Sequence, residues 1–217
     1  MEKTYNAQFL APFNMVVSGG SYSGKSEWVF RLITHAKEMI QPNVDLIYYC
    51  YKEYSDRFND IKGVTFFQGF EESIISKENL KSKSCLLILD DLMCDINEKI
   101  LLDLFLVYSH HRSVYPIFIC HSLYHSGLKC NRTISLSTTY NVIMKSNRDK
   151  SSIRVLASQM FPGQVKWFVE AFSYATRDNF SYIVVDSRST QADELRVRTR
   201  VFPGEDMICF IPNIKAS

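Results

Sequence analysis

Eight consecutive residues decide the fold of this chain: Gly19-Gly20-Ser21-Tyr22-Ser23-Gly24-Lys25-Ser26. They match the pattern G-x-x-x-x-G-K-S, in which loop amides wrap phosphate oxygens and glycine lets the backbone come close. An apolar run at residues 13–17 precedes them and predicts a buried strand. Apolar residues at helical spacing follow over residues 26–40, before Pro42. A strand, a glycine-rich loop and a helix in this order are the context that a phosphate-binding loop requires.

The residue types of this loop predict how it holds a nucleotide. All eight residues are expected to bind the phosphates, helped by the positive end of the helix dipole. Lys25 is expected to bridge the β- and γ-phosphates, and Ser26 to ligate Mg²⁺. A chance glycine turn is the alternative, and the strand and helix on either side argue against it.

A second motif, Leu86-Leu87-Ile88-Leu89-Asp90-Asp91, places two carboxylates after four aliphatic residues. The aliphatic run predicts a strand buried on both faces, and two adjacent acids at its end are unusual for a core. This is the pattern of a Walker B element. We expect Asp90 to hold the Mg²⁺ shell and Asp91 to act as general base or to position water. The alternative is a strand followed by an aspartate helix cap.

Bulk properties limit the function classes. The 217 residues and net charge of +2 fit one domain over residues 1–217 without a global polyanion-binding signature. The N-terminus lacks a signal-peptide pattern, and no apolar run approaches the length of a membrane span. Six cysteines without a C-x-x-C pair suggest reduced thiols in a cytosol or nucleus. A zinc site from Cys120, His121, His125 and Cys130 is a weaker alternative, since Cys120 is expected to end a buried strand.

Strand and helix patterns alternate along the chain. Further strands are predicted at 44–51, 64–67, 115–120, 140–144 and 182–186. A surface helix and connector are predicted at 71–84. Further helices are predicted from near Ile96 to residues 110–112, with Asp95 and Glu98 as a capping pair, and at 151–160 and 164–176. The alternation predicts an α/β fold of the P-loop NTPase class, with a mostly parallel sheet and helices on both faces.

The remaining motifs separate the P-loop classes. GTPases should show D-x-x-G and N-K-x-D, and neither pattern is present. Two aspartates after an aliphatic strand, and one more strand near Tyr115, resemble the additional-strand ATPases, in which the extra strand lies between the Walker A and Walker B strands.

Within that class the chain resembles the FtsK/HerA-type genome-packaging ATPases of poxvirus-like viruses, adenovirus-like elements and Maverick/Polinton transposons. The resemblance rests on both Walker elements and on residues 110–112, 132–136, 145–149, 159–163 and 202–205. It implies a homo-oligomeric ring that uses ATP and Mg²⁺ to push double-stranded viral DNA into a capsid, with capsid or portal proteins as partners. It also implies a location at the site of virion assembly, in the host cytoplasm or nucleus or on the virion.

The resemblance also concerns catalytic residues. Such enzymes usually carry glutamine as a polar sensor after the strand between the Walker elements, where this chain has His121. His121 is expected either to replace that sensor, to weaken hydrolysis, or only to satisfy a loop carbonyl. Ring ATPases complete each site with an arginine from the neighbouring subunit. Arg132 is the favoured candidate, followed by Arg148, with Arg112 at the end of a helix; a surface salt bridge is the alternative for each.

Two basic groups are candidates for contact with DNA. Arg196, Arg198 and Arg200 alternate with other residues and would share one face of a strand, and Lys77, Lys81 and Lys83 form a second group. A solvated surface explains either group equally well or better. The sequence therefore favours a DNA-translocating ATPase. A nucleotide-binding switch or scaffold with little turnover is the alternative, and a small-molecule kinase is a weaker third.

Overall fold

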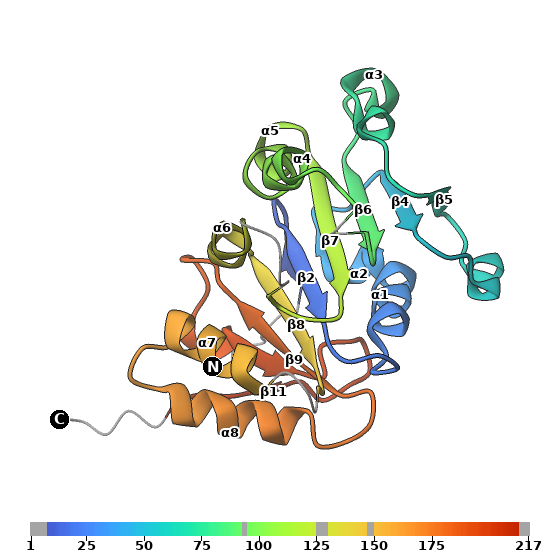
Figure 1. The fold of residues 1–217 in the computed structure, drawn as a ribbon. Coiled ribbons are helices and arrows are strands. Elements are labelled where there is room, and N and C mark those ends of the chain that lie inside the picture. Colours follow the sequence, from blue (N-terminus) through green and yellow to red (C-terminus); the bar gives the residue numbers. More distant parts are fainter. Residues whose placement is uncertain (1–7, 93–94, 125–129, 147–149, 213–217) are drawn as a thin grey trace.

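One large sheet organises the described part of the chain, which in this computed structural model comprises residues 8–92, 95–124, 130–146 and 150–212. The sheet has nine strands in the order β11-β10-β9-β8-β2-β7-β6-β4-β5 (Figure 1). Its parallel strands are β2 (Met15–Ser18), β4 (Leu46–Tyr51), β5 (Thr65–Gln68), β6 (Cys85–Asp90), β7 (Val114–Cys120) and β8 (Tyr140–Met144). The antiparallel strands are β9 (Tyr182–Asp186), β10 (Val197–Thr199) and β11 (Ile208–Cys209). A small parallel pair joins β1 (Phe9–Leu10) to β3 (Ile40–Gln41).

The strand order confirms the predicted fold class. Strand β7 pairs with β2 on one side and with β6 on the other, so it is the additional strand between the two Walker strands. The carboxyl ends of these three strands lie at the same edge of the sheet, where parallel α/β sheets bind their ligands.

Helices cover both faces of the sheet. They are α1 (Lys25–Thr34), α2 (Ala36–Met39), α3 (Lys77–Leu80), α4 (Glu98–Asp103), α5 (Ser109–His111), α6 (Asn131–Ser137), α7 (Lys150–Met160) and α8 (Val165–Ala175). Short 3-10 turns are η1 (Asp56–Asp60), η2 (Glu72–Ile75) and η4 (Asp193–Leu195), and η3 (Leu104–Tyr108) is a π-helical segment.

Side chains of β2 alternate between the two faces, as the period of a strand requires. Met15 and Val17 belong to the core that includes Trp28 and Leu32 of α1. Val16 points the other way, into the core beneath α4 and η3. A third core lies between β8, β9 and the helices α7 and α8. The strand that leads into the glycine loop is therefore buried on both sides.

The π-helical segment has a local cause in the side chain of Asn14. Its amide nitrogen donates to the carbonyl oxygen of Phe105 at 2.8 Å, and its amide oxygen accepts from the backbone nitrogen of Thr139 at 2.7 Å. A side chain that bonds a helix carbonyl competes with the regular ladder at that turn. Asn14 thus connects the start of β2 to η3 and to the approach to β8.

Two helix predictions need correction. The predicted helix at 26–40 divides at His35 into α1 and α2. Residues 71–84, predicted as a surface helix and connector, form η2, α3 and a connector that begins where Lys81 and Ser82 adopt left-handed φ angles of 49° and 63°. The helix predicted from residue 96 begins at Glu98, and its cap is Asn97, whose side chain accepts from the backbone nitrogen of Lys99.

The predicted arginine face at 196–200 is also wrong. Only Arg198 lies in β10, where 1% of it is exposed, and its Nη1 atom lies 3.4 Å from Asp186 Oδ2. Arg196 follows η4 and lies over the ring of Phe161, and Arg200 has a left-handed φ of 55°. The three guanidinium groups therefore do not form a shared surface.

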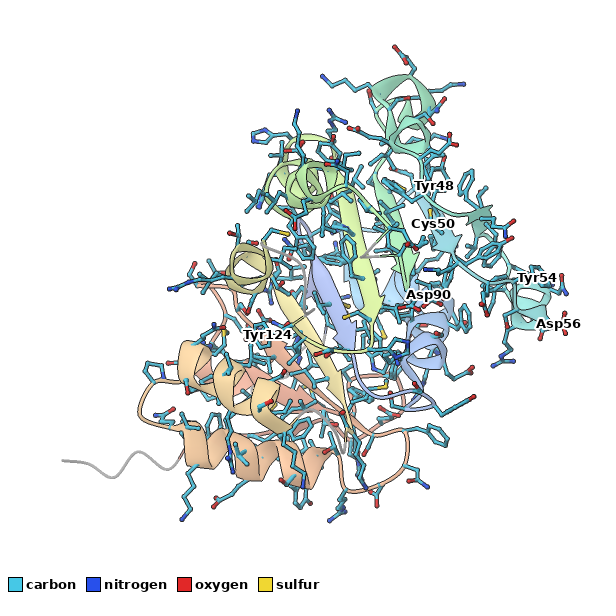
Figure 2. The ribbon with its side chains drawn as sticks, in the orientation of Figure 1. Tyr48, Cys50, Tyr54, Asp56, Asp90 and Tyr124 are labelled. Carbon is cyan, nitrogen blue, oxygen red and sulfur yellow. The ribbon has the colours of Figure 1, made fainter. Side chains whose placement is uncertain are left out.

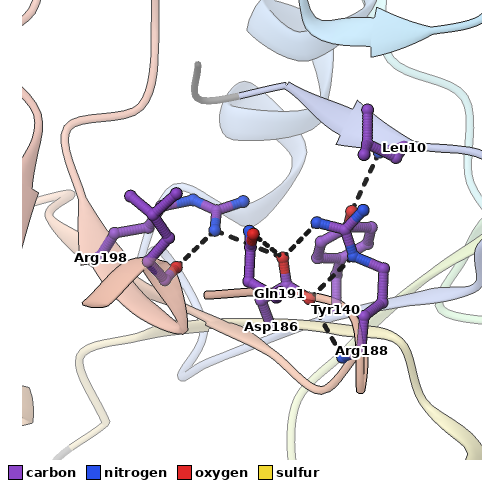
Figure 3. A network of polar contacts seen from close by, with 7 residues as sticks. Leu10, Tyr140, Asp186, Arg188, Gln191 and Arg198 are labelled. Carbon is purple, nitrogen blue, oxygen red and sulfur yellow. Dashed lines mark hydrogen bonds and ion pairs between the residues drawn. The ribbon is translucent and has the colours of Figure 1, made fainter. Parts of the chain in front are cut away.

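Asp186 is the centre of a buried polar network (Figure 3). It is fully buried and accepts from Arg188 Nη2 at 2.6 Å and from Gln191 Nε2 at 2.9 Å, in addition to Arg198. The hydroxyl of Tyr140, which lies beside this network, accepts from the backbone nitrogen of Leu10 at 2.9 Å. The network lies at the amino ends of the parallel strands, opposite the glycine loop, because Asp186 pairs with Tyr140 at the start of β8.

Candidate nucleotide-binding site

The glycine loop connects β2 to α1 at the carboxyl edge of the sheet. Gly24 has a φ of 93°, which disfavours any other residue there. A Cβ atom on Gly19 would lie 2.7 Å from Ser23 Oγ and 2.8 Å from Met144 Cβ, so a side chain at that position would displace the loop. The two glycines that the motif requires are thus the two that the packing requires.

The side chain of Lys25 folds back onto the glycine loop. Its Nζ atom donates to the carbonyl oxygens of Gly19 at 3.0 Å and Gly20 at 2.9 Å. Burial lowers the pKa of Lys25, while the nearby carboxylates of Asp90 and Asp91 oppose that shift. A triphosphate that entered the loop would offer this ammonium group charged oxygens in place of neutral carbonyls.

Asp90 is held from two directions at the end of β6, beside α1 (Figure 2). Its Oδ2 atom accepts from the hydroxyl of Tyr49 at 2.5 Å and from the hydroxyl of Ser26 at 3.3 Å. Burial raises the pKa of Asp90, and these two hydrogen bonds lower it in part. The structure thus brings together the two residues predicted as Mg²⁺ ligands, and a serine hydroxyl beside a carboxylate is a donor set that suits Mg²⁺.

Asp91 and His121 follow neighbouring strands. Asp91 has a left-handed φ of 56°, and its backbone nitrogen donates to the carbonyl oxygen of Ile119 at 3.1 Å. This turn leaves the carboxylate about half exposed, 3.7 Å from His121 Nε2. Both side chains lie at the edge where a γ-phosphate would stand, with an acceptor on one strand and an imidazole on the next. Their catalytic roles stay predictions.

Two of the three candidate arginines lie away from the Walker residues of the same chain. Arg132 is exposed on α6. This helix lies toward the amino ends of β2 and β8 (Figure 1), and its Ile134 belongs to the core beneath η3. The Walker residues of the same chain are at the opposite edge. Arg148 falls outside the described residues. Arg112 lies over the ring of Tyr108 at 3.9 Å and is 3.8 Å from Glu72, so its contacts are structural.

The zinc alternative gains no support. Cys120 is buried, and its thiol donates to the carbonyl oxygen of Ser122 at 3.2 Å. Among the described residues no three histidine, cysteine or acidic side chains gather as a metal site, and His125 falls outside those residues.

Sequence reasoning missed Tyr49 as a member of the site. It sits in an aromatic run of β4, and only the sheet order brings it to Asp90, which lies 41 residues further along the chain. A hollow of about 680 Å³ lies beyond the carboxyl end of α1 near His35 and Asp45, away from the glycine loop. It contains none of the Walker residues.

Fold and site together define an α/β P-loop nucleotide-binding protein with the additional strand. The structure is similar to that of B204, the DNA-packaging ATPase of Sulfolobus turreted icosahedral virus, with a TM-score of 0.58 and 12% identity, covering 93% of this chain and 98% of that one. It is also similar to the genome-packaging NTPase B204 of Sulfolobus turreted icosahedral virus 2 in complex with ATP-gammaS, with a TM-score of 0.54 and 14% identity, over 93% and 98% of the two chains.

A third similar structure is the cytoplasmic domain of the type VII secretion ATPase EccC of Thermomonospora curvata. Its TM-score is 0.50 at 12% identity, and the match covers 84% of this chain but 25% of that one. No family model and no curated protein matches the sequence. At these identities the likeness concerns the fold, and it confirms the predicted resemblance to viral packaging ATPases at that level. Within the described residues, no helix combines the length and apolar character needed to cross a membrane.

Proposed function

We propose that this chain is an ATP-driven motor that translocates double-stranded viral DNA into a capsid during virion assembly. One observation carries the proposal: Ser26 and Tyr49 converge on Asp90 beside the glycine loop, on a fold shared over nearly its whole length with a packaging NTPase. The motor works as a homo-oligomeric ring at the site of virion assembly, in the host cytoplasm or nucleus or on the virion, together with capsid or portal proteins.

The residues of this chain divide the work as follows. Lys25 exchanges the carbonyl oxygens of Gly19 and Gly20 for oxygens of the β- and γ-phosphates. Ser26 and Asp90 hold Mg²⁺, which supplies charge neutralisation at the phosphates when it is bound. Asp91 accepts the proton of the attacking water or orients that water, and His121 lies close enough to hold the same water or the γ-phosphate.

A second function has one specific observation in its favour. Arg132, the favoured arginine, lies on α6 toward the amino ends of β2 and β8, away from the Walker residues of the same chain. With His121 in the sensor position, a single chain fits a nucleotide-binding switch or scaffold with little turnover. In the motor, a neighbouring subunit supplies the missing cation.

The rate of ATP hydrolysis, measured as a function of DNA length, distinguishes the motor from the switch. Steady-state ATPase activity is measured with double-stranded DNA of increasing length, on samples whose mass is determined at the same concentration. A motor gives activity that rises with assembly and with DNA, and Lys25→Ala abolishes it. Nucleotide binding with low turnover that neither DNA nor assembly stimulates would favour the switch and overturn the motor.

A further inference from the structure

A hollow of about 260 Å³ opens beside the glycine loop, on the side away from Asp90. It is lined by Gly24, Glu27, Trp28 and Arg31 from the loop and α1, and by Phe180, Tyr182 and Phe202 from the C-terminal third; Glu27 is itself paired with Arg57. In the sheet order, Asp90 lies two strands to one side of β2 and Tyr182 lies two strands to the other side. A nucleotide whose γ-phosphate points to Asp90 therefore directs its base toward this hollow.

Phe180 gives the hollow a stacking surface. The side chain is 68% exposed although it is large and apolar, and it is held in a left-handed backbone conformation with a φ of 61°. Its ring lies against the glycine loop, because a Cβ atom on Gly24 would stand 3.0 Å from Phe180 Cδ1. An exposed aromatic ring fixed beside a phosphate-binding loop is placed to cover a flat, apolar group.

Three further aromatic rings of the wall pack against one another. The ring centroids of Trp28 and Phe202 are 5.4 Å apart and those of Trp28 and Tyr182 are 5.7 Å apart, both in edge-to-face contact. Arg31 lies over the ring of Phe202 at 4.1 Å and is fixed by Glu205, whose Oε1 atom is 2.6 Å from its Nη1 atom. The edge of its guanidinium group therefore offers N–H donors to the ring nitrogens of a base.

We propose that this hollow binds the purine base of the nucleotide whose phosphates the glycine loop holds, with the base stacked on Phe180. The inference rests on the proposed function, because it requires the phosphates to lie in the loop. Stacking strength grows with the area of the base, so the same contact favours ATP and GTP over CTP and UTP.

The test compares ATP with inorganic tripolyphosphate, which carries the phosphates and no base. Both are titrated calorimetrically into wild-type protein, Phe180→Ala, Phe180→Trp and Lys25→Ala. Tyr54→Ala is the matched control, because Tyr54 is another exposed aromatic residue, 58% exposed, that does not line the hollow. Unchanged melting temperatures establish that the variants are folded.

Phe180→Ala is expected to weaken ATP binding about tenfold, leave tripolyphosphate binding unchanged and reduce the preference for ATP over UTP. Phe180→Trp is expected to restore ATP affinity, and Tyr54→Ala to behave as wild type. The proposed base pocket is overturned if Phe180→Ala binds ATP as tightly as wild type does. It is also overturned if the affinities for ATP and tripolyphosphate fall by the same factor. If wild-type protein binds neither compound, the proposed function fails as well; if both bind and depend on Lys25, only the base pocket is at issue.

Discussion

The hydroxyl of Tyr49 donates a 2.5 Å hydrogen bond to the same carboxylate oxygen of Asp90 that accepts from Ser26. Burial raises the pKa of Asp90, and both hydrogen bonds act against that rise by stabilising the ionised form. The tyrosine therefore helps to keep a buried metal-binding carboxylate charged without adding a positive charge near the phosphates.

Tyr49→Phe tests this relationship. The substitution keeps the ring that stacks on Phe30 and removes only the donor to Asp90, so the pKa of Asp90 should rise further. Asp90 then becomes protonated at a higher pH, and Mg²⁺-dependent tightening of nucleotide binding should be lost earlier as the pH falls. Titrations of ATP with and without Mg²⁺ between about pH 5 and pH 8 measure this. Tyr48→Phe, on the opposite face of β4, is the control, and identical curves for the two variants would contradict the prediction.

Asp90→Asn should stabilise the metal-free protein at neutral pH. Since the folded pKa of Asp90 lies above the unfolded value, its stabilising contribution is present at low pH and is lost as the pH rises through the folded pKa. The neutral amide removes that loss, and each kcal/mol gained raises the melting temperature by roughly 2–4 °C. The same variant should lose the additional stabilisation that Mg²⁺ gives to nucleotide-bound protein. Thermal melts with and without Mg²⁺ test both points, and a lower metal-free melting temperature would refute the first.

His121→Gln should preserve or raise turnover if His121 occupies the sensor position. A protonated imidazole 3.7 Å from Asp91 would pair with that carboxylate and oppose its role as a base. Glutamine keeps a hydrogen-bond donor and has no ionisable group, so kcat of the variant should depend less on pH. The comparison is His111→Gln, in the exposed turn of α5. An unchanged rate and pH profile would assign His121 a structural role.

Arg132→Ala tests completion of the site by a neighbour. An arginine finger contributes about 10³-fold or more to the rate, so the variant should lose turnover and keep ATP binding. Mixing it with Lys25→Ala should restore part of the activity, because some interfaces would then combine an intact Lys25 with an intact Arg132. Arg154→Ala, an exposed arginine on α7, serves as control. If mixed rings form and remain inactive, Arg132 does not act across the interface, and Arg148 becomes the next candidate.

The buried network around Asp186 should tolerate the loss of Arg198 better than the loss of the carboxylate. Asp186→Ala leaves Arg188 and Arg198 without their buried partner and should cost about 3–5 kcal/mol of unfolding free energy. In Arg198→Met, Asp186 keeps Arg188 and Gln191, and two guanidinium nitrogens that already lack a hydrogen-bond partner among the described residues are removed. Urea denaturation measures both values, and an equal or larger loss in Arg198→Met would contradict this account.

Local chemistry explains which features could be predicted from the sequence. The glycine loop and the two aspartates after β6 depend on a few adjacent residues, so their pattern specified both the elements and their position. The place of β7 between the Walker strands followed from the family resemblance, and the strand order confirms it.

Long-range contacts explain the rest. Tyr49 and Phe180 join the site only through the order of the strands and the path of a distant loop, which no local pattern encodes. The arginine pattern at 196–200 indicated an exposed face, but Asp186 from another strand draws Arg198 into the interior. Periodicity indicates which residues share a face and does not indicate what covers that face.

The position of β2 in the sheet has a consequence for biosynthesis. Both of its partner strands, β7 and β8, come from residues 114–144, whereas β4 can pair with β5 and β6 within residues 46–90. On the ribosome, where chains emerge from the amino terminus, we expect the Walker B half of the sheet to form while the apolar strand before the glycine loop is still unpaired. That strand would need protection by a chaperone until β7 and β8 arrive, so nascent chains stalled before residue 140 should be the aggregation-prone species.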